Sequence, residues 1–165
     1  MPTPFGLAFA IERDETGLVA ASFERGPRAT ARIRDPLLAD AAAQVRVYFR
    51  RRLRRFEVPL SLEGTPLQLA AWRLVANLEF GDVVAYGDIA RAIGRPGAHR
   101  GVAHAMARTP LALFIPAHRV LGADGSLKGA AEGSLRARLF AFERPKVTLQ
   151  SGVDPCKDDR LAKGD

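Results

Sequence analysis

The sequence predicts a mixed α/β (α+β) protein, with a small N-terminal α/β domain followed by a helical domain that contains a helix-turn-helix. Three observations carry this prediction. Two apolar runs near the N-terminus flank a polar turn, a long amphipathic helix follows them, and two short helical segments farther along are separated by glycine and proline. A chain of 165 residues can bury a core in one ordinary domain or in two small ones.

A β-hairpin and one helix are predicted to open the chain. The apolar runs 5–11 and 18–23 flank a polar segment that ends in Gly17, a pattern typical of a hairpin. Asp35 and Pro36 then supply a capping carboxylate and a first-turn proline for a helix. The apolar face of this helix recurs at spacings of three and four residues: Leu37, Leu38, Ala41, Val45, Tyr48, Phe49 and Leu53.

The end of this first helix is expected to carry the densest positive run of the chain, Arg50 to Arg55. These arginines could contact DNA phosphates or a partner protein. The alternative, which we favour, is a solvated helix end whose cations suit the negative end of the helix dipole.

A second helix is predicted to follow a linker over 58–64. Thr65 supplies an N-cap, Pro66 a first-turn proline and Gln68 the partner residue of a capping box. We expect Gly81 to end this helix. Its apolar content is Leu69, Trp72, Leu74, Val75 and Leu78, and Trp72 is expected in the core.

Two short helices over 87–93 and 98–107, separated by 94–97, have the spacing of a helix-turn-helix. The second is rich in small residues: Ala98, Gly101, Ala103, Ala105 and Ala107. Such a slim helix lacks the long side chains that read base edges in the major groove, and it suits the narrow minor groove. Close packing between helices is the alternative explanation, and we favour it for Ala105.

The chain divides into three expected units. Residues 1–60 form the N-terminal domain with its linker, 61–148 the helical domain and 149–165 a polar tail. The tail holds Cys156, the one cysteine of the chain, so an intrachain disulfide is impossible. Acidic neighbours of Cys156 disfavour a thiolate, and we expect no catalytic role for it.

The formal net charge of +7 favours a polyanionic partner. Lys and Arg number 25 against 18 Asp and Glu, and nucleic acid is the usual polyanion because phosphate contacts release bound counterions. A basic surface that only aids solubility is the alternative. Hydrophobic residues make up 47%, without a long apolar run or a secretory pattern, so we expect a cytoplasmic monomer that does not bind membranes.

A seven-residue stretch resembles the active-site loop of the O6-alkylguanine-DNA alkyltransferases. It reads Ile115, Pro116, Ala117, His118, Arg119, Val120 and Leu121. In that family the loop reads Pro-Cys-His-Arg-Val, and the cysteine sulfur accepts the alkyl group of the damaged base. Ala117 therefore stands where the family has its nucleophile. Further matches follow the family's order from Thr65 to Glu143: Gln68, Trp72, 81–90, 94–100, Pro110 and 125–127.

The resemblance implies an alkyltransferase-like fold that binds DNA through the minor groove. Arg100 matches the arginine that fills the space left by an extruded nucleotide, where a planar cation can stack and donate hydrogen bonds. Tyr86 matches the tyrosine that helps rotate the neighbouring phosphate. The implied DNA-binding residues are Tyr86, Ala98, Arg100, Gly101 and Ala103. The implied lesion pocket is Tyr86, Met106, Ala117, Val120 and Ala130.

His118 and Glu143 match the relay that removes the cysteine proton in the family. With Ala117 in the cysteine position, this relay is expected to be vestigial, and no residue is assigned a catalytic role. Arg119 is expected to clamp the structure rather than contact the lesion. No metal or cofactor is expected, because no cluster of metal ligands is evident.

Further departures from the family accompany Ala117. Thr109 replaces the asparagine that ties the helix-turn-helix to the loop, Ala130 replaces a pocket tyrosine, and 131–135 is altered. Together they resemble the alkyltransferase-like proteins, which bind O6-alkylguanine and flag it for nucleotide excision repair. The prediction is therefore that the chain is not an enzyme. It is instead expected to flip O6-alkylguanine out of duplex DNA and flag it to nucleotide excision repair proteins.

Three alternatives remain open. The chain could be an alkyltransferase inactivated by a Cys→Ala substitution at position 117. It could dealkylate the base by hydrolysis through His118 and Glu143, although water is a poor nucleophile at an alkyl carbon. It could be a sequence-specific helix-turn-helix regulator, against which the slim second helix argues.

Overall fold

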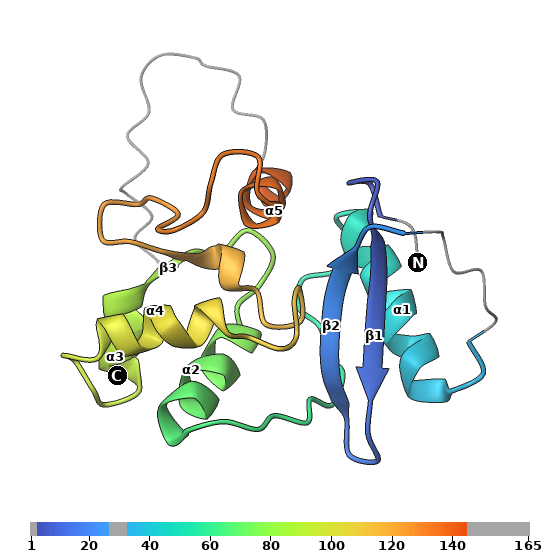
Figure 1. Cartoon of the computed structure of the whole chain (residues 1–165), viewed down its shortest axis with the longest axis horizontal. Coiled ribbons are helices and arrows are strands. Elements are labelled where there is room, and N and C mark those ends of the chain that lie inside the picture. Colours follow the sequence, from blue (N-terminus) through green and yellow to red (C-terminus); the bar gives the residue numbers. More distant parts are fainter. Residues whose placement is uncertain (1–2, 27–32, 145–165) are drawn as a thin grey trace.

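The computed structural model describes residues 3–26 and 33–144, and within them it has the mixed α/β architecture expected from the sequence. A two-stranded antiparallel sheet with one helix lies on one side of the molecule (Figure 1). The remaining helices and a small parallel sheet form the other side. No helix in the described ranges is long and apolar enough to span a bilayer.

The N-terminal hairpin forms as predicted. β1 (Ala8–Arg13) pairs antiparallel with β2 (Leu18–Glu24). The polar turn between them closes because the Asp14 carboxylate accepts hydrogen bonds from the backbone N–H groups of Thr16 and Gly17, at 2.7 and 2.9 Å. An aspartate that bonds to the backbone two and three residues ahead is a common way to fix such a turn.

The long helix α1 (Pro36–Phe49) packs beside this hairpin (Figure 1). It begins as predicted, with the Asp35 carboxylate accepting a hydrogen bond from the N–H of Leu38 at 2.9 Å. It ends at Phe49, so the expectation that the arginine run belongs to the helix was wrong. Arg51 has φ of 58°, a left-handed conformation that helical residues do not adopt, and the chain turns away there.

Parts of the arginine run are engaged within the molecule. Arg54 forms an ion pair with Glu79, which lies in the loop after the second helix. The guanidinium carbon of Arg51 lies 4.8 Å from the centre of the Phe142 ring. These contacts favour a structural, solvated surface.

The second helix, α2 (Pro66–Ala76), opens with the predicted capping box. Thr65 Oγ1 accepts from the N–H of Gln68 at 3.3 Å, and Gln68 Oε1 accepts from the N–H of Thr65 at 2.8 Å. The prediction that Gly81 ends this helix was wrong, because Asn77 is its C-cap. The side chain of Asn77 donates to a carbonyl of the last turn at 2.8 Å, and Gly81 instead occupies a later turn with φ of 86°.

The predicted helix-turn-helix consists of α3 (Tyr86–Ala92) and α4 (His99–Ala107). The turn begins with Gly94 at φ of 73°, a conformation that glycine adopts without strain. α4 packs against both α3 and α2. Trp72 in α2 is a core residue, as predicted, and its indole N–H donates to the carbonyl of Ala105 at 2.9 Å.

A small parallel sheet joins the segment around position 120 to the start of the helix-turn-helix. β3 (Val84–Ala85) directly precedes α3 and pairs with β4 (Val120–Leu121). The 3-10 turn η1 (Ala117–Arg119) leads into β4, and α5 (Leu135–Glu143) is the last element of the described residues. Residues around position 117 therefore lie beside the start of α3.

The hairpin also forms backbone hydrogen bonds with the segment that leads to η1. The N–H of Ala21 donates to the carbonyl of Pro110, and the N–H of Ala112 donates to the carbonyl of Ala21, both at 3.0 Å. In the same way the N–H of Leu18 donates to the carbonyl of Pro59 at 2.9 Å. The N-terminal sheet is thus continued by single bridges from two segments, one before α2 and one after α4.

Gly17→Ala tests how closely the hairpin must approach the 59–61 segment. A Cβ at Gly17 would lie 2.7 Å from the Pro59 oxygen and 2.9 Å from the Ser61 nitrogen, both backbone atoms. We expect the free energy of unfolding in urea to fall by about 1–3 kcal/mol, the usual cost of overpacking. Gly26→Ala is the matched control, because a Cβ there meets nothing within 4 Å. An unchanged stability for Gly17→Ala would contradict the tight approach.

Candidate functional site

Two hollows lie beside α4 and η1. The larger is a groove of about 650 Å³ lined by Tyr86, Gly87, Arg91, Pro96, His99, Arg100, Ala103, Gly122, Ala123 and Lys128. The smaller is a cavity of about 130 Å³ lined by Thr109, Ala112, Leu113, Ile115, Ala117, His118, Leu135, Arg136 and Leu139. Among residues 3–26 and 33–144, no cluster of His, Cys, Asp and Glu could hold a metal ion.

Cationic side chains border the groove. Arg91 is paired with Asp88, and Lys128 is paired with Asp124. The side chain of Arg100 is exposed and forms no hydrogen bond or ion pair with another residue in the part of the chain that the structure describes. Its guanidinium is therefore available to a ligand without the loss of an internal contact.

The small residues of α4 serve two purposes. Ala103 lines the groove, and the half-buried Ala98 is the N-cap of α4. A Cβ at Gly101 would lie 3.3 Å from the side chain of Leu67, so Gly101 allows α4 to approach α2 closely. Ala105 is fully buried, as the packing explanation expects. Of the small residues predicted to meet DNA, Ala103 borders the groove and Gly101 also contributes to packing.

Ala117 begins η1 and lines the small cavity. The other residues predicted for the lesion pocket lie elsewhere. Tyr86 lines the groove, Met106 and Val120 are buried in the core and border neither hollow, and Ala130 lies half-buried in the loop before α5, also outside both. The cavity next to Ala117 is formed instead by α5 and by the segment that leads to η1.

Thr109 stands at the wall of this cavity. Its Oγ1 is buried and has no hydrogen-bond partner within the described ranges. A buried hydroxyl without a partner costs about 1–3 kcal/mol. The side chain of Thr109 therefore forms no hydrogen bond to another described residue at this position.

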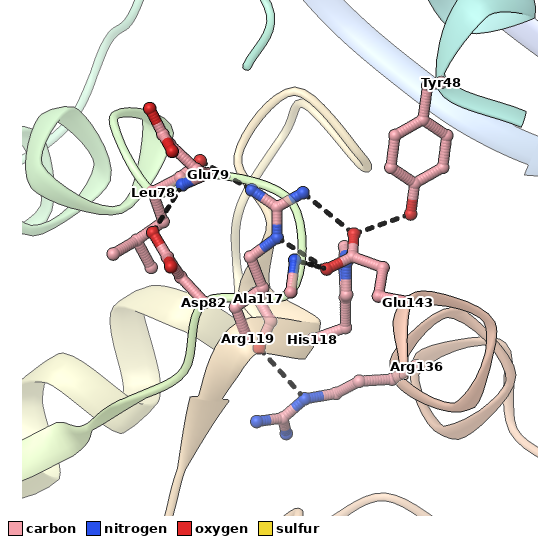
Figure 2. A network of polar contacts seen from close by, with 10 residues as sticks. Tyr48, Leu78, Glu79, Asp82, Ala117, His118, Arg119, Arg136 and Glu143 are labelled. Atoms are coloured by element: carbon pink, nitrogen blue, oxygen red, sulfur yellow. Dashed lines mark hydrogen bonds and ion pairs between the residues drawn. The ribbon is translucent and has the colours of Figure 1, made fainter. Parts of the chain in front are cut away.

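Glu143, at the end of α5, is the centre of a buried hydrogen-bond network (Figure 2). Its carboxylate accepts from His118 Nε2 and from the Tyr48 hydroxyl, each at 2.7 Å. Arg119 donates to it twice, from Nε and Nη2, at 2.8 Å each. The backbone N–H of Gly81 donates at 3.1 Å. One carboxylate thus joins α1, the loop after α2, η1 and α5.

Arg119 makes a second contact with the loop after α2. Its remaining Nη1 donates to the carbonyl of Leu78 at 2.6 Å, and its side chain is 3% exposed. The guanidinium points toward the carboxylate of Glu143 (Figure 2). This is the geometry of an internal clamp.

The surroundings of these groups decide which of them carry charge. Burial raises the pKa of Glu143, but hydrogen bonds from His118 and Arg119 outweigh it and hold the pKa well below its usual range. Burial lowers the pKa of His118, so its imidazole is neutral near pH 7 and donates its Nε2 hydrogen. Burial and the Glu143 charge raise the pKa of Tyr48, which stays a hydroxyl donor. The ion pair is therefore Arg119 with Glu143.

Sequence reasoning missed two residues of this region. Tyr48 was assigned only to the apolar face of α1, yet its hydroxyl reaches Glu143. Arg136 was not singled out, yet it donates hydrogen bonds to the carbonyls of Ala117 and Val120. The available signals were a hydroxyl on an otherwise apolar face and a cation in the first turn of a helix, where it opposes the helix dipole.

Glu143→Gln tests the importance of the buried ion pair. It would leave the Arg119 charge buried without a counterion, and we expect the free energy of unfolding in urea to fall by about 3–5 kcal/mol. Arg119→Gln should cost a similar amount, and the double variant should cost less than the sum of the two. Arg54→Gln, in the exposed pair with Glu79, is the control and should change stability little. Additive effects of Glu143→Gln and Arg119→Gln would contradict the coupling.

Two family profiles match the chain. The one described as 6-O-methylguanine DNA methyltransferase, ribonuclease-like domain, matches residues 1–62. The one described as 6-O-methylguanine DNA methyltransferase, DNA binding domain, matches residues 66–144. Together they include every element of the groove, the cavity and the Glu143 network.

The related proteins overturn one prediction. A methylated-DNA–protein-cysteine methyltransferase of Methanosarcina acetivorans is 37% identical over 128 residues, which cover 73% of this chain and 80% of the relative. Further relatives, 35% to 42% identical, carry the same name, which is that of an enzyme. The prediction that the chain is not an enzyme is contradicted by these relatives. That prediction was drawn from Ala117, which has no thiol. The one thiol of the chain belongs to Cys156, which lies outside the described residues.

Solved structures agree with the profiles. The structure of Mycobacterium tuberculosis OGT in complex with DNA superposes with a TM-score of 0.70 at 32% identity, covering 87% of this chain and 89% of that one. A methylated-DNA–protein-cysteine methyltransferase of Mycolicibacterium paratuberculosis is 36% identical over 146 residues, 86% of this chain and 88% of the relative. The chain therefore belongs to the 6-O-methylguanine DNA methyltransferase family, the O6-alkylguanine-DNA alkyltransferases.

Proposed function

We propose that this DNA-binding protein recognises O6-alkylguanine in duplex DNA by drawing the damaged base toward the cavity beside Ala117. The observation that carries the proposal is the position of that cavity. It lies next to the groove of the helix-turn-helix, and Arg136 touches residues of both. A base that leaves the helix at the groove would have a short path to Ala117.

Contact with the duplex is assigned to the groove. Arg100 is unpaired there, and Arg91 and Lys128 can exchange their aspartate partners for phosphates. The related OGT of Mycobacterium tuberculosis has been solved in complex with DNA, which supports binding through the same fold. We propose that α4 enters the minor groove and that Arg100 fills the space of the extruded base.

Recognition of the alkyl group is assigned to the small cavity. Its walls are mainly apolar, and Ala117 contributes only a methyl group at the position of the family's cysteine. A volume of about 130 Å³ leaves space for a small alkyl substituent, whose burial there is favourable. We further propose that the bound lesion is flagged to nucleotide excision repair proteins, which rests on the resemblance to alkyltransferase-like proteins.

Transfer of the alkyl group to protein is the second candidate activity, because the relatives are named methyltransferases. Ala117 carries no atom that can accept an alkyl group, and Cys156 is the one thiol of the chain. Intact-mass measurement after incubation with an O6-methylguanine duplex distinguishes the two activities. A gain of one methyl group that disappears in Cys156→Ser would establish transfer.

The central experiment compares two duplexes of one sequence that differ only in O6-methylguanine or guanine at a single site. Binding is measured at one fixed salt concentration, because phosphate contacts make affinity depend strongly on salt. We expect a clear preference for the lesion duplex. Equal affinity for the two duplexes would reject lesion recognition and leave general DNA binding.

Arg100→Ala should remove most of the lesion preference. Without the guanidinium, the gap left by the extruded base stays unfilled, and we expect the preference to fall at least about tenfold. Binding to undamaged DNA, which depends on phosphates, should change little. Arg108→Ala removes an exposed cation at the other end of α4 and serves as the charge-matched control. A lesion preference equal to that of the wild type would exclude Arg100 from this role.

A further inference from the structure

Arg136 lies at the boundary between the groove and the small cavity. Its Nε donates to the carbonyl of Ala117 at 3.2 Å, and its Nη1 donates to the carbonyl of Lys128 at 2.8 Å. Its Nη2 donates to the hydroxyl of Tyr86 and to the carbonyl of Val120, both at 2.7 Å. The side chain reaches from α5 toward the backbone of Ala117 (Figure 2).

These four bonds span both hollows. Arg136 and Ala117 line the cavity, whereas Tyr86 and Lys128 line the groove. The guanidinium therefore lies between residues that line the groove and residues that line the cavity. Any group that passes from the groove to Ala117 along this line meets the guanidinium first.

Arg136 lies at a position where a positive charge destabilises the helix. It is the second residue of α5, at the end of the helix where a positive charge opposes the dipole. Its four acceptors within residues 3–26 and 33–144 are all neutral, and no carboxylate in these ranges pairs with the guanidinium. Arg119 has two bonds to Glu143 and is fixed, so Arg136 is the arginine of this site that can leave at lower cost.

We propose that Arg136 closes the passage between the groove and the cavity in the free protein, and that a flipped base enters by replacing its guanidinium at the acceptors of Ala117, Val120 and Tyr86. A guanidinium and the N1–C2–N2 edge of guanine are both planar N–C–N units that carry an amino group. Alkylation at O6 leaves the 2-amino donors of guanine intact. N1 of the lesion base carries no hydrogen, so its 2-amino group can donate to two of these acceptors, the carbonyls of Ala117 and Val120.

The inference rests on the proposed function, since it assumes that a base enters this site. A closed passage reduces the apparent affinity for the lesion by the fraction of molecules that are open. Opening it permanently should therefore tighten lesion binding, while contact with undamaged DNA, in which no base enters, should be unaffected. A merely structural role for Arg136 predicts the opposite sign, because loss of its four bonds would disorder the loop.

The experiment measures Arg136→Ala against wild type with the paired O6-methylguanine and guanine duplexes at one salt concentration. We expect the lesion preference to rise about tenfold if nine molecules in ten are closed in the wild type. Arg138→Ala removes a cation from the same helix outside both hollows and should leave the preference unchanged. Millimolar methylguanidinium should refill the vacated acceptors, and so raise the thermal midpoint of Arg136→Ala and reverse its gain in lesion preference.

The outcomes separate the two proposals. If the wild type prefers the lesion and Arg136→Ala shows an equal or weaker preference, the closed passage is overturned. Lesion recognition is then still supported. No lesion preference in either protein overturns lesion recognition, and the closed passage with it. A preference that rises in Arg136→Ala and falls again with methylguanidinium establishes Arg136 as the group that a base must displace.

Discussion

The buried carboxylate of Glu143 holds together the elements that form the site. A carboxylate in the core is costly unless every lone pair is used, and Glu143 receives five hydrogen bonds from four residues. These donors come from α1, the loop after α2 and η1. Because the ion pair with Arg119 sits inside a low-dielectric core, its geometry tolerates little displacement, and the loop that contains Ala117 is fixed with it.

The same network explains why the frame of the site persists with alanine at position 117. His118, Arg119 and Glu143 bond to one another and to Tyr48 through atoms that do not include the side chain of Ala117. The network therefore does not depend on a thiol. Burial keeps His118 neutral through its lowered pKa, so the positive charge that balances Glu143 is that of Arg119.

Around this rigid centre, the cationic groups that border the groove are held more loosely. Arg91 and Lys128 are paired with aspartates on the surface, where such pairs contribute little to stability and exchange readily for phosphate. Arg136 is held by neutral acceptors alone. This contrast divides the site into an interior held by the Glu143 network and a rim of side chains held by weaker contacts.

Local patterns of sequence were enough to determine most elements and their starts. The caps at Asp35 and Thr65, the turn at Gly17 and the helix-turn-helix around Gly94 all depend on bonds between neighbours in the chain, so the sequence predicts them. The ends of α1 and α2 were misplaced, because a left-handed Arg51 and the capping by Asn77 leave weaker signals than glycine or proline.

The composition of the two hollows was decided by the tertiary structure. Motif matching placed Met106, Val120 and Ala130 in one pocket with Ala117, but the fold buries Met106 and Val120 and leaves Ala130 outside. The partnership of Tyr48 with Glu143, separated by 95 residues, and that of Arg136 with Tyr86, separated by 50, leave no periodic or local trace. The sequence by itself therefore determined the hairpin, the first four helices and the family, but it did not predict β3, η1, β4 and α5. Only tertiary packing decided which side chains meet, because those contacts join segments distant along the chain.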